Sequence, residues 1–156
     1  QDDELNFRVI KNGYKILLSP KIKSYYSSRS SLKNLWKQYY QYGFWKERVM
    51  QKHGKPASLR HLVPATFVIT NILGAILSLF NKYIFYLWML EVALYIFCDL
   101  IFSIKLIKKN KNIKKYIFFI FPILHISYGI GFINGLFNFY IFKSKKAIEK
   151  NTKMSR

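Results

Sequence analysis

Three long apolar runs constrain the fold of this chain more than any other feature of its sequence. They cover 63–80, 83–104 and 116–142. As helices rising 1.5 Å per residue, they would reach roughly 27, 33 and 40 Å, against a bilayer hydrocarbon core of about 30 Å. A soluble domain of this size rarely keeps such runs, so the sequence predicts an α-helical membrane region of about three segments. The third is long enough that we expect it to tilt, to break at Pro122 or to continue as an interfacial helix.

Composition argues against two other classes of protein. The 156 residues carry 26 Lys and Arg against 7 Asp and Glu, a net charge of +19, yet 51% are hydrophobic and 19% are aromatic. Disordered basic tails are poor in such residues, so a histone-like tail is not expected. The single cysteine, Cys98, lies within the second apolar run, which argues against a disulfide framework and a thiolate metal cluster.

The first third of the chain differs sharply from the rest. Residues 1–62 hold 13 Lys and Arg against 4 acids, a net charge of +9, and no long apolar run. The chain begins at Gln1 without an initiator Met, and we expect that it continues a longer protein. We divide it into four parts: 1–29, 30–62, the membrane region 63–142 and a basic tail 143–156.

Residues 1–29 predict one helix and two strands. Residues 2–12 read as a helix, with acids at the N-terminus and Gly13 just past the end. Residues 14–19 and 21–26 alternate like strands, and Pro20 separates them.

Residues 30–62 predict one long amphipathic helix. Ser30 or Ser31 would cap it, and Gly54 follows its last residue near His53. Aromatic and basic side chains interleave along it, which fits a helix lying on an anionic cytoplasmic surface. Packing on a soluble domain explains the pattern equally well. Both interpretations hold together if one face of the helix packs on protein while the other touches lipid headgroups. Binding of single-stranded nucleic acid is a weaker alternative, because the helix adjoins membrane segments.

Basic loops predict the orientation of the membrane region. Residues 1–62 and 105–115 should be cytoplasmic, which makes the first two segments a hairpin whose connection at 81–82 faces outward. The tail from Lys143 carries six further Lys and Arg and should also be cytoplasmic, but three simple spans would place it outside. The sequence does not decide on which side of the membrane the tail lies.

Three ionisable residues interrupt the apolar runs, namely Glu91, Asp99 and His125. Such groups are costly in a membrane and are candidates for function. Local pairing is the favoured alternative for the two acids, with Lys105 close to Asp99. For His125 we favour a packed, hydrogen-bonded imidazole over a metal ligand, because it has no partner motif.

Small residues recur at a spacing of four in the third run, at Ser127, Gly131 and Gly135. This spacing lets two helices approach closely, so helix packing is the leading interpretation and a channel lining the weaker one.

The start of the chain carries its strongest chemical pattern, a cluster of three acids at Asp2, Asp3 and Glu4. Acids at a helix N-terminus can simply complement the helix dipole. Alternatively, one carboxylate is a general base, because deprotonating a hydroxyl nucleophile requires an acceptor within hydrogen-bond reach.

This start, Gln1-Asp2-Asp3-Glu4-Leu5-Asn6-Phe7-Arg8 followed by Gly13 and Pro20, resembles the acidic stretch of membrane-bound family 2 glycosyltransferases of the bacterial succinoglycan-synthesis type. Downstream, 29–31 and 37–43 resemble that family's later segment, which is similar to the Gln-x-x-Arg-Trp motif of polysaccharide synthases. Gln38, Gln41 and Tyr42 occupy the matching positions. Gln41 replaces the usual Arg and Tyr42 the usual Trp.

The resemblance implies a mixed fold, with the end of a GT-A α/β catalytic domain before an interfacial helix and the membrane segments. It assigns Asp2 as the catalytic base of an inverting sugar transfer. It assigns acceptor or donor binding to five residues: Asp3, Arg8, Gln38, Gln41 and Tyr42. A divalent metal, Mg²⁺ or Mn²⁺, is expected with ligands outside this chain, and no metal ligand is assigned within it.

The implied partners are a nucleotide-sugar donor, a glycan or lipid-linked acceptor and anionic lipids, with no nucleic acid. The implied location is the inner (cytoplasmic) membrane, with the catalytic part facing the cytoplasm. The alternative is a small basic membrane protein that anchors to anionic lipid or assists a complex without catalysis.

Overall fold

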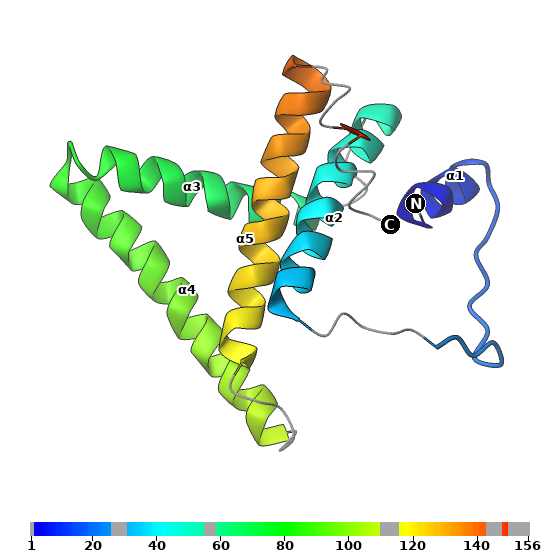
Figure 1. Ribbon diagram of the computed structural model, residues 1–156, viewed down its shortest axis with the longest axis horizontal. Coiled ribbons are helices and arrows are strands. Elements are labelled where there is room, and N and C mark those ends of the chain that lie inside the picture. Colours follow the sequence, from blue (N-terminus) through cyan, green and yellow to red (C-terminus); the bar gives the residue numbers. More distant parts are fainter. Residues whose placement is uncertain (1, 26–30, 55–58, 110–115, 143–147, 150–156) are drawn as a thin grey trace.

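The computed structural model describes residues 2–25, 31–54, 59–109, 116–142 and 148–149, and every regular element within them is helical (Figure 1). Helices α2, α3 and α4 all contact α5, which is therefore the centre of the fold. The elements are α1 (Asp2–Lys11), α2 (Leu32–His53), the 3₁₀ helix η1 (Leu59–His61), α3 (Val63–Leu77), α4 (Lys82–Lys109), α5 (Ile117–Leu136) and the π-helix η2 (Phe137–Ile141).

The prediction that the chain contains the end of a GT-A α/β domain is wrong, because the described residues contain no β-strand. Residues 14–25 follow a non-helical path with a turn at Pro20, where the Ile22 N–H donates to the Ser19 carbonyl over 3.2 Å. A strand must pair its N–H and C=O groups with a neighbour, and no described segment forms a ladder with these residues. The strands predicted from side-chain alternation at 14–19 and 21–26 are therefore wrong for residues 14–25. Residue 26 lies outside the described residues.

The two helices predicted in the polar third are confirmed. Residue Gly13 follows α1 with φ +80°, a conformation that glycine adopts readily. At the start of α2 the Ser31 hydroxyl accepts from the Asn34 N–H over 3.2 Å. At its end Gly54 adopts φ +72°, and its N–H donates to the Met50 carbonyl over 2.8 Å. Local capping chemistry thus sets the boundaries of α2.

Three helical stretches are long and apolar enough to cross a membrane, which confirms the predicted number: Leu59–Leu77, Lys82–Lys109 and Ile117–Ile141. The first two form a hairpin. Large apolar side chains remain exposed all round α4, as expected for a helix surrounded by lipid. The third stretch does not break at Pro122, which lies within α5, and it continues as η2. The chain therefore has the composition of a multi-pass membrane protein.

The closest packing in the fold joins α2 to α5, which run side by side in the same direction (Figure 1). A Cβ added at Gly43 of α2 would overlap the Tyr128 carbonyl, and one added at Gly131 would overlap the Tyr40 carbonyl. Phe44 is completely buried, and its ring lies 5.0 Å from that of Phe139. The predicted packing role of the small residues in the third run is confirmed at this interface.

Glu47 is an acid enclosed by the same interface. Its side chain is 2% exposed and its Cβ lies 3.2 Å from where a Cβ on Gly135 would be. Burial disfavours the charged form and raises the pKa of Glu47 from 4.5 to about 7. The facing element η2 contributes one ionisable group, Tyr140.

We expect the pH dependence of stability to follow Glu47. Between about pH 4.5 and 7 the unfolded carboxyl loses its proton while the folded one keeps it, so stability falls as pH rises, by about 3 kcal/mol in total. In Glu47→Gln this loss should disappear from thermal unfolding curves recorded in detergent by circular dichroism. Glu149→Gln, an exposed control, should keep it. A wild-type protein that gains stability across this range would contradict the assignment.

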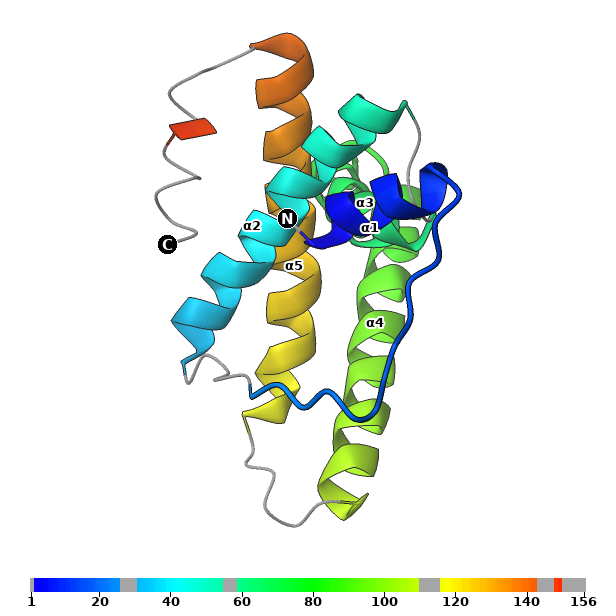
Figure 2. The same cartoon turned by 90° about the vertical axis from the view of Figure 1, so that its right-hand side faces the viewer.

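The α3–α4 hairpin projects from one side of α5. Figure 1 shows α3 leaving α5 sideways and α4 returning obliquely towards the start of α5, and in Figure 2 α3 is seen nearly along its axis. Where α3 meets α5, Gly129 faces the Pro64 carbonyl and Val68. Helix α5 therefore lies between α2 and the beginning of α3.

Candidate functional site

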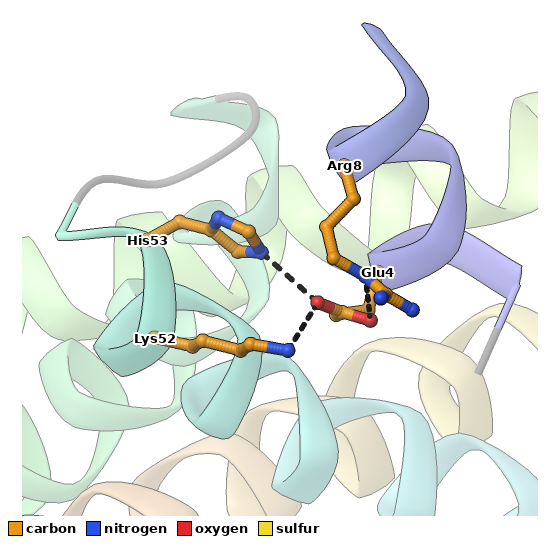
Figure 3. Close-up of polar contacts among 4 residues, drawn as sticks. All are labelled: Glu4, Arg8, Lys52 and His53. Atoms are coloured by element: carbon orange, nitrogen blue, oxygen red, sulfur yellow. Dashed lines mark hydrogen bonds and ion pairs between the residues drawn. The ribbon is translucent and has the colours of Figure 1, made fainter. Parts of the chain in front are cut away.

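The acidic helix α1 is attached to the C-terminal end of α2 through Glu4, whose polar contacts Figure 3 shows, and through Phe7. One of its carboxylate oxygens, Oε1, accepts from Lys52 Nζ over 2.7 Å and lies 3.4 Å from His53 Nε2. The other, Oε2, accepts from Arg8 Nε over 3.0 Å. The Phe7 ring packs on the His53 ring with centroids 4.2 Å apart. Glu4 therefore links two helices that are far apart in the sequence.

The surrounding cations favour the ionised form of Glu4. The hydrogen bond from Lys52 is the largest cause that holds the pKa of Glu4 below 4.5; burial opposes it in part, and the charge of Arg8 supports it. Because the folded pKa is lowered, this attachment contributes stability above about pH 4.5 and loses it as pH falls through the folded pKa.

Removing this attachment should release α1 without unfolding α2. In Lys52→Gln we expect the backbone amides of α1 to exchange with deuterium several-fold faster at neutral pH, because Glu4 loses its shortest contact. Lys33→Gln removes a similar exposed charge at the opposite end of α2 and serves as the matched control. Equal exchange of α1 in both variants would contradict this role of Lys52.

The structure places the predicted site residues in two groups. Asp2 and Asp3 lie in the first turn of α1, and Arg8 lies one turn beyond Glu4. On α2, Gln38 Nε2 donates to the Tyr42 hydroxyl over 2.7 Å. Ten residues of helix, about 15 Å, separate Tyr42 from Lys52, where α1 is attached. The described residues therefore bring Gln38 and Tyr42 together but hold Arg8 apart from them.

Gln41 differs from its two neighbours in the predicted motif. Its side chain is 5% exposed, whereas that of Tyr42 is 53% exposed. Because the two residues are adjacent on α2, they point to different faces of the helix. Gln41 therefore contributes to the packed side of α2, and Tyr42 is available to a molecule outside it.

A divalent metal does not fit the described residues. They contain no group of three His, Cys, Asp or Glu side chains placed to hold an ion. The ligands of the Mg²⁺ or Mn²⁺ that the resemblance implies would have to be supplied from outside these residues.

A second candidate site lies among the apolar helices. A cavity of about 310 Å³ opens between α3, α4 and α5, and its walls are almost entirely apolar. Four ionisable side chains line it: Tyr95, Cys98, Asp99 and His125. The Tyr95 hydroxyl and His125 Nδ1 are 2.9 Å apart, which confirms the prediction of a hydrogen-bonded imidazole. Sequence reasoning missed Tyr95, although its i, i+4 spacing to Asp99 places both on one face of α4.

The two membrane acids have different surroundings. Glu91 accepts from the Thr70 hydroxyl over 2.7 Å and from Asn71 Nδ2 over 3.4 Å, which confirms local pairing. Asp99 forms no ion pair with Lys105, so that expectation is wrong; among the described residues its buried Oδ1 has no hydrogen-bond partner. Asp99 instead faces the cavity beside His125.

No protein-family model, curated protein or solved structure shows significant similarity to this chain. The resemblance to family 2 glycosyltransferases therefore stays a prediction, carried by the residues quoted above.

Proposed function

We propose that this chain is the membrane-attached part of an inverting glycosyltransferase. The observation that supports the proposal most is the attachment of the acidic helix to a membrane-associated scaffold. Glu4 ties α1 to the end of α2, and α2 is packed along the apolar α5. The helix that contains Asp2 and Asp3 thus lies at the end of a basic amphipathic helix, which supports a site where a water-soluble nucleotide-sugar and a membrane-borne acceptor can meet.

In the proposed reaction Asp2 acts as general base. Its carboxylate takes the proton from an acceptor hydroxyl as that oxygen forms a bond to the anomeric carbon. The bond from this carbon to the donor phosphate breaks, and its electron pair leaves with the nucleoside diphosphate. Attack opposite the leaving group inverts the anomeric configuration.

The other predicted residues bind rather than react. The Arg8 guanidinium remains half exposed while it pairs with Glu4, so it can still approach an anionic donor. Asp3, next to Asp2, and the Gln38–Tyr42 pair offer hydrogen bonds to sugar hydroxyls. Gln41 lies on the packed face of α2, so its contribution to the site is to hold the helix that presents this pair.

The direct test is sugar transfer by membranes from cells that express the complete reading frame containing this chain. Membranes are incubated with a panel of radiolabelled nucleotide-sugars, and label is followed into lipid extracts and into polymer. We expect transfer from at least one donor above the level of empty-vector membranes. Absence of transfer from every donor, with the protein present and folded, would contradict the proposal.

A second function, non-catalytic anchoring to anionic lipid, is favoured by the exposed cations of α2. Lys33, Lys37 and Arg48 are all exposed. An anchor predicts salt-sensitive association with anionic lipid and no transfer activity. An enzyme can share the first property, so only transfer activity separates the two functions.

A further inference from the structure

We propose that α5 does not cross the membrane but lies along its cytoplasmic surface, paired with α2 and in contact with anionic phospholipid headgroups. Only α3 and α4 then cross, and the two ends of the chain lie on the same side. This inference concerns how the protein meets the bilayer and does not depend on sugar transfer.

Helix α2 is basic along its length. Four of its exposed residues are cations, Lys33 and Lys37 near its start and Arg48 and Lys52 near its end. Within hydrocarbon each such cation costs about 2.5–3.5 kcal/mol near the middle of a span. Both ends of α2 must therefore meet water or headgroups.

The register of the helix pair keeps α5 beside α2. Contacts join Tyr40 to Gly131, Phe44 to Gly135, and the Gln51 amide to the Phe139 carbonyl over 3.2 Å. The two helices thus stay together from Tyr40 to Gln51 of α2, and their backbones touch at the glycines. Since α2 must stay at the surface, α5 cannot pass through a core of about 30 Å.

The direction and length of the hairpin also fit this arrangement. If α5 lies in the membrane plane, α3 leaves it towards the opposite leaflet and α4 returns obliquely (Figures 1 and 2). The 19-residue stretch Leu59–Leu77 reaches about 28 Å. The 28 residues of α4 reach about 42 Å, which matches a core of about 30 Å when the helix is tilted by about 45°.

This arrangement also resolves the conflict of charges found in the sequence. With α5 at the surface, the six Lys and Arg from Lys143 onward lie on the same side as residues 1–62. Both basic segments then obey the positive-inside rule. Exposed Trp36 and Tyr42 on α2 suit the headgroup layer, where aromatic rings with a polar edge accumulate. The cations beside them select anionic lipids.

Reporter fusions to the full chain test the side of the membrane. We expect green fluorescent protein after Arg156 to fluoresce and alkaline phosphatase at the same point to be inactive, whereas alkaline phosphatase inserted after Phe80 should be active. Active phosphatase after Arg156 would place the tail outside and overturn the proposal.

Depth measurements test the position of α5 itself. Cys98 is replaced by Ser, and spin labels are attached to single cysteines at exposed positions Phe119, Ile130 and Tyr140. We expect equal depths at all three, because the helix lies parallel to the surface. A deepest value at Ile130, with shallow values at both ends, would show a transmembrane helix and refute the surface pair.

The lipid is tested with the same protein in nanodiscs. Amides of α2 should exchange more slowly in discs containing phosphatidylglycerol than in discs of phosphatidylcholine alone. Equal exchange in the two kinds of disc would refute selection of anionic headgroups. The difference should shrink in Lys37→Gln but not in Lys108→Gln, whose charge lies at the end of α4.

Discussion

Replacing Asp2 by Asn in the complete protein is expected to reduce sugar transfer by about 10²- to 10⁴-fold, the usual contribution of a general base. Asparagine keeps the size and helix position of the side chain but cannot take the proton from the hydroxyl of the sugar acceptor. We therefore expect kcat to fall while KM for the nucleotide-sugar changes little. The measurement is initial-rate transfer in membranes, normalised to the amount of folded protein.

Two comparisons make this result specific. Glu149→Gln removes a carboxylate far along the chain and should retain full activity. Asp3→Asn should have a smaller effect, mainly on KM, because we assign it to binding. Sugar transfer by Asp2→Asn close to the wild-type rate would refute the assignment of Asp2 as the base. If activity falls only in proportion to the amount of folded protein, the role of Asp2 is to stabilise α1 and not to take the proton.

Replacing Gly131 by Ala is expected to separate α2 from α5. The added methyl would overlap the carbonyl oxygen of Tyr40, which belongs to the backbone of a rigid helix and cannot move aside. Overpacking of this kind costs typically about 1–3 kcal/mol. For a chain of this length, that corresponds to a fall in Tm of roughly 3–10 °C.

A second glycine provides the matched control. At Gly74 an added methyl would lie 2.7 Å from Cδ1 of the Trp88 ring, so it meets a side chain and not the backbone of a neighbouring helix. Gly74→Ala should therefore lower Tm clearly less than Gly131→Ala in the same detergent. An equal or larger fall at Gly74 would mean that the α2–α5 interface is less rigid than its backbone contacts indicate.

Local sequence signals predicted the helices well. The boundaries of α2 follow from Ser31 and Gly54, whose capping chemistry acts within a few residues. The three apolar stretches were predicted by length and hydropathy alone. The strands failed because alternation in 14–19 reports a local preference, whereas a strand depends on a partner that the described chain does not contain.

Long-range pairing accounts for what the sequence did not reveal. The small residues Gly131 and Gly135 predicted a close helix contact but not its partner, which lies about 90 residues earlier. Similarly, Glu4 was one acid of a cluster in the sequence, and its partner Lys52 is 48 positions away. The pairing of Tyr95 with His125 joins two apolar helices, and nothing local to either residue specifies it.

The pairing of α2 with α5 also means that α2 is synthesised well before the helix that covers it. Gln51 and its partner Phe139 are 88 positions apart, so at about 5–20 residues per second α5 leaves the ribosome roughly 4–18 s after α2. During this interval Phe44 and Glu47 lack the helix that later covers them. The nascent α2 must stay on the lipid surface or bound to a chaperone while the hairpin inserts. If the ribosome stalls before α5 is made, α2 should be exposed to proteolysis.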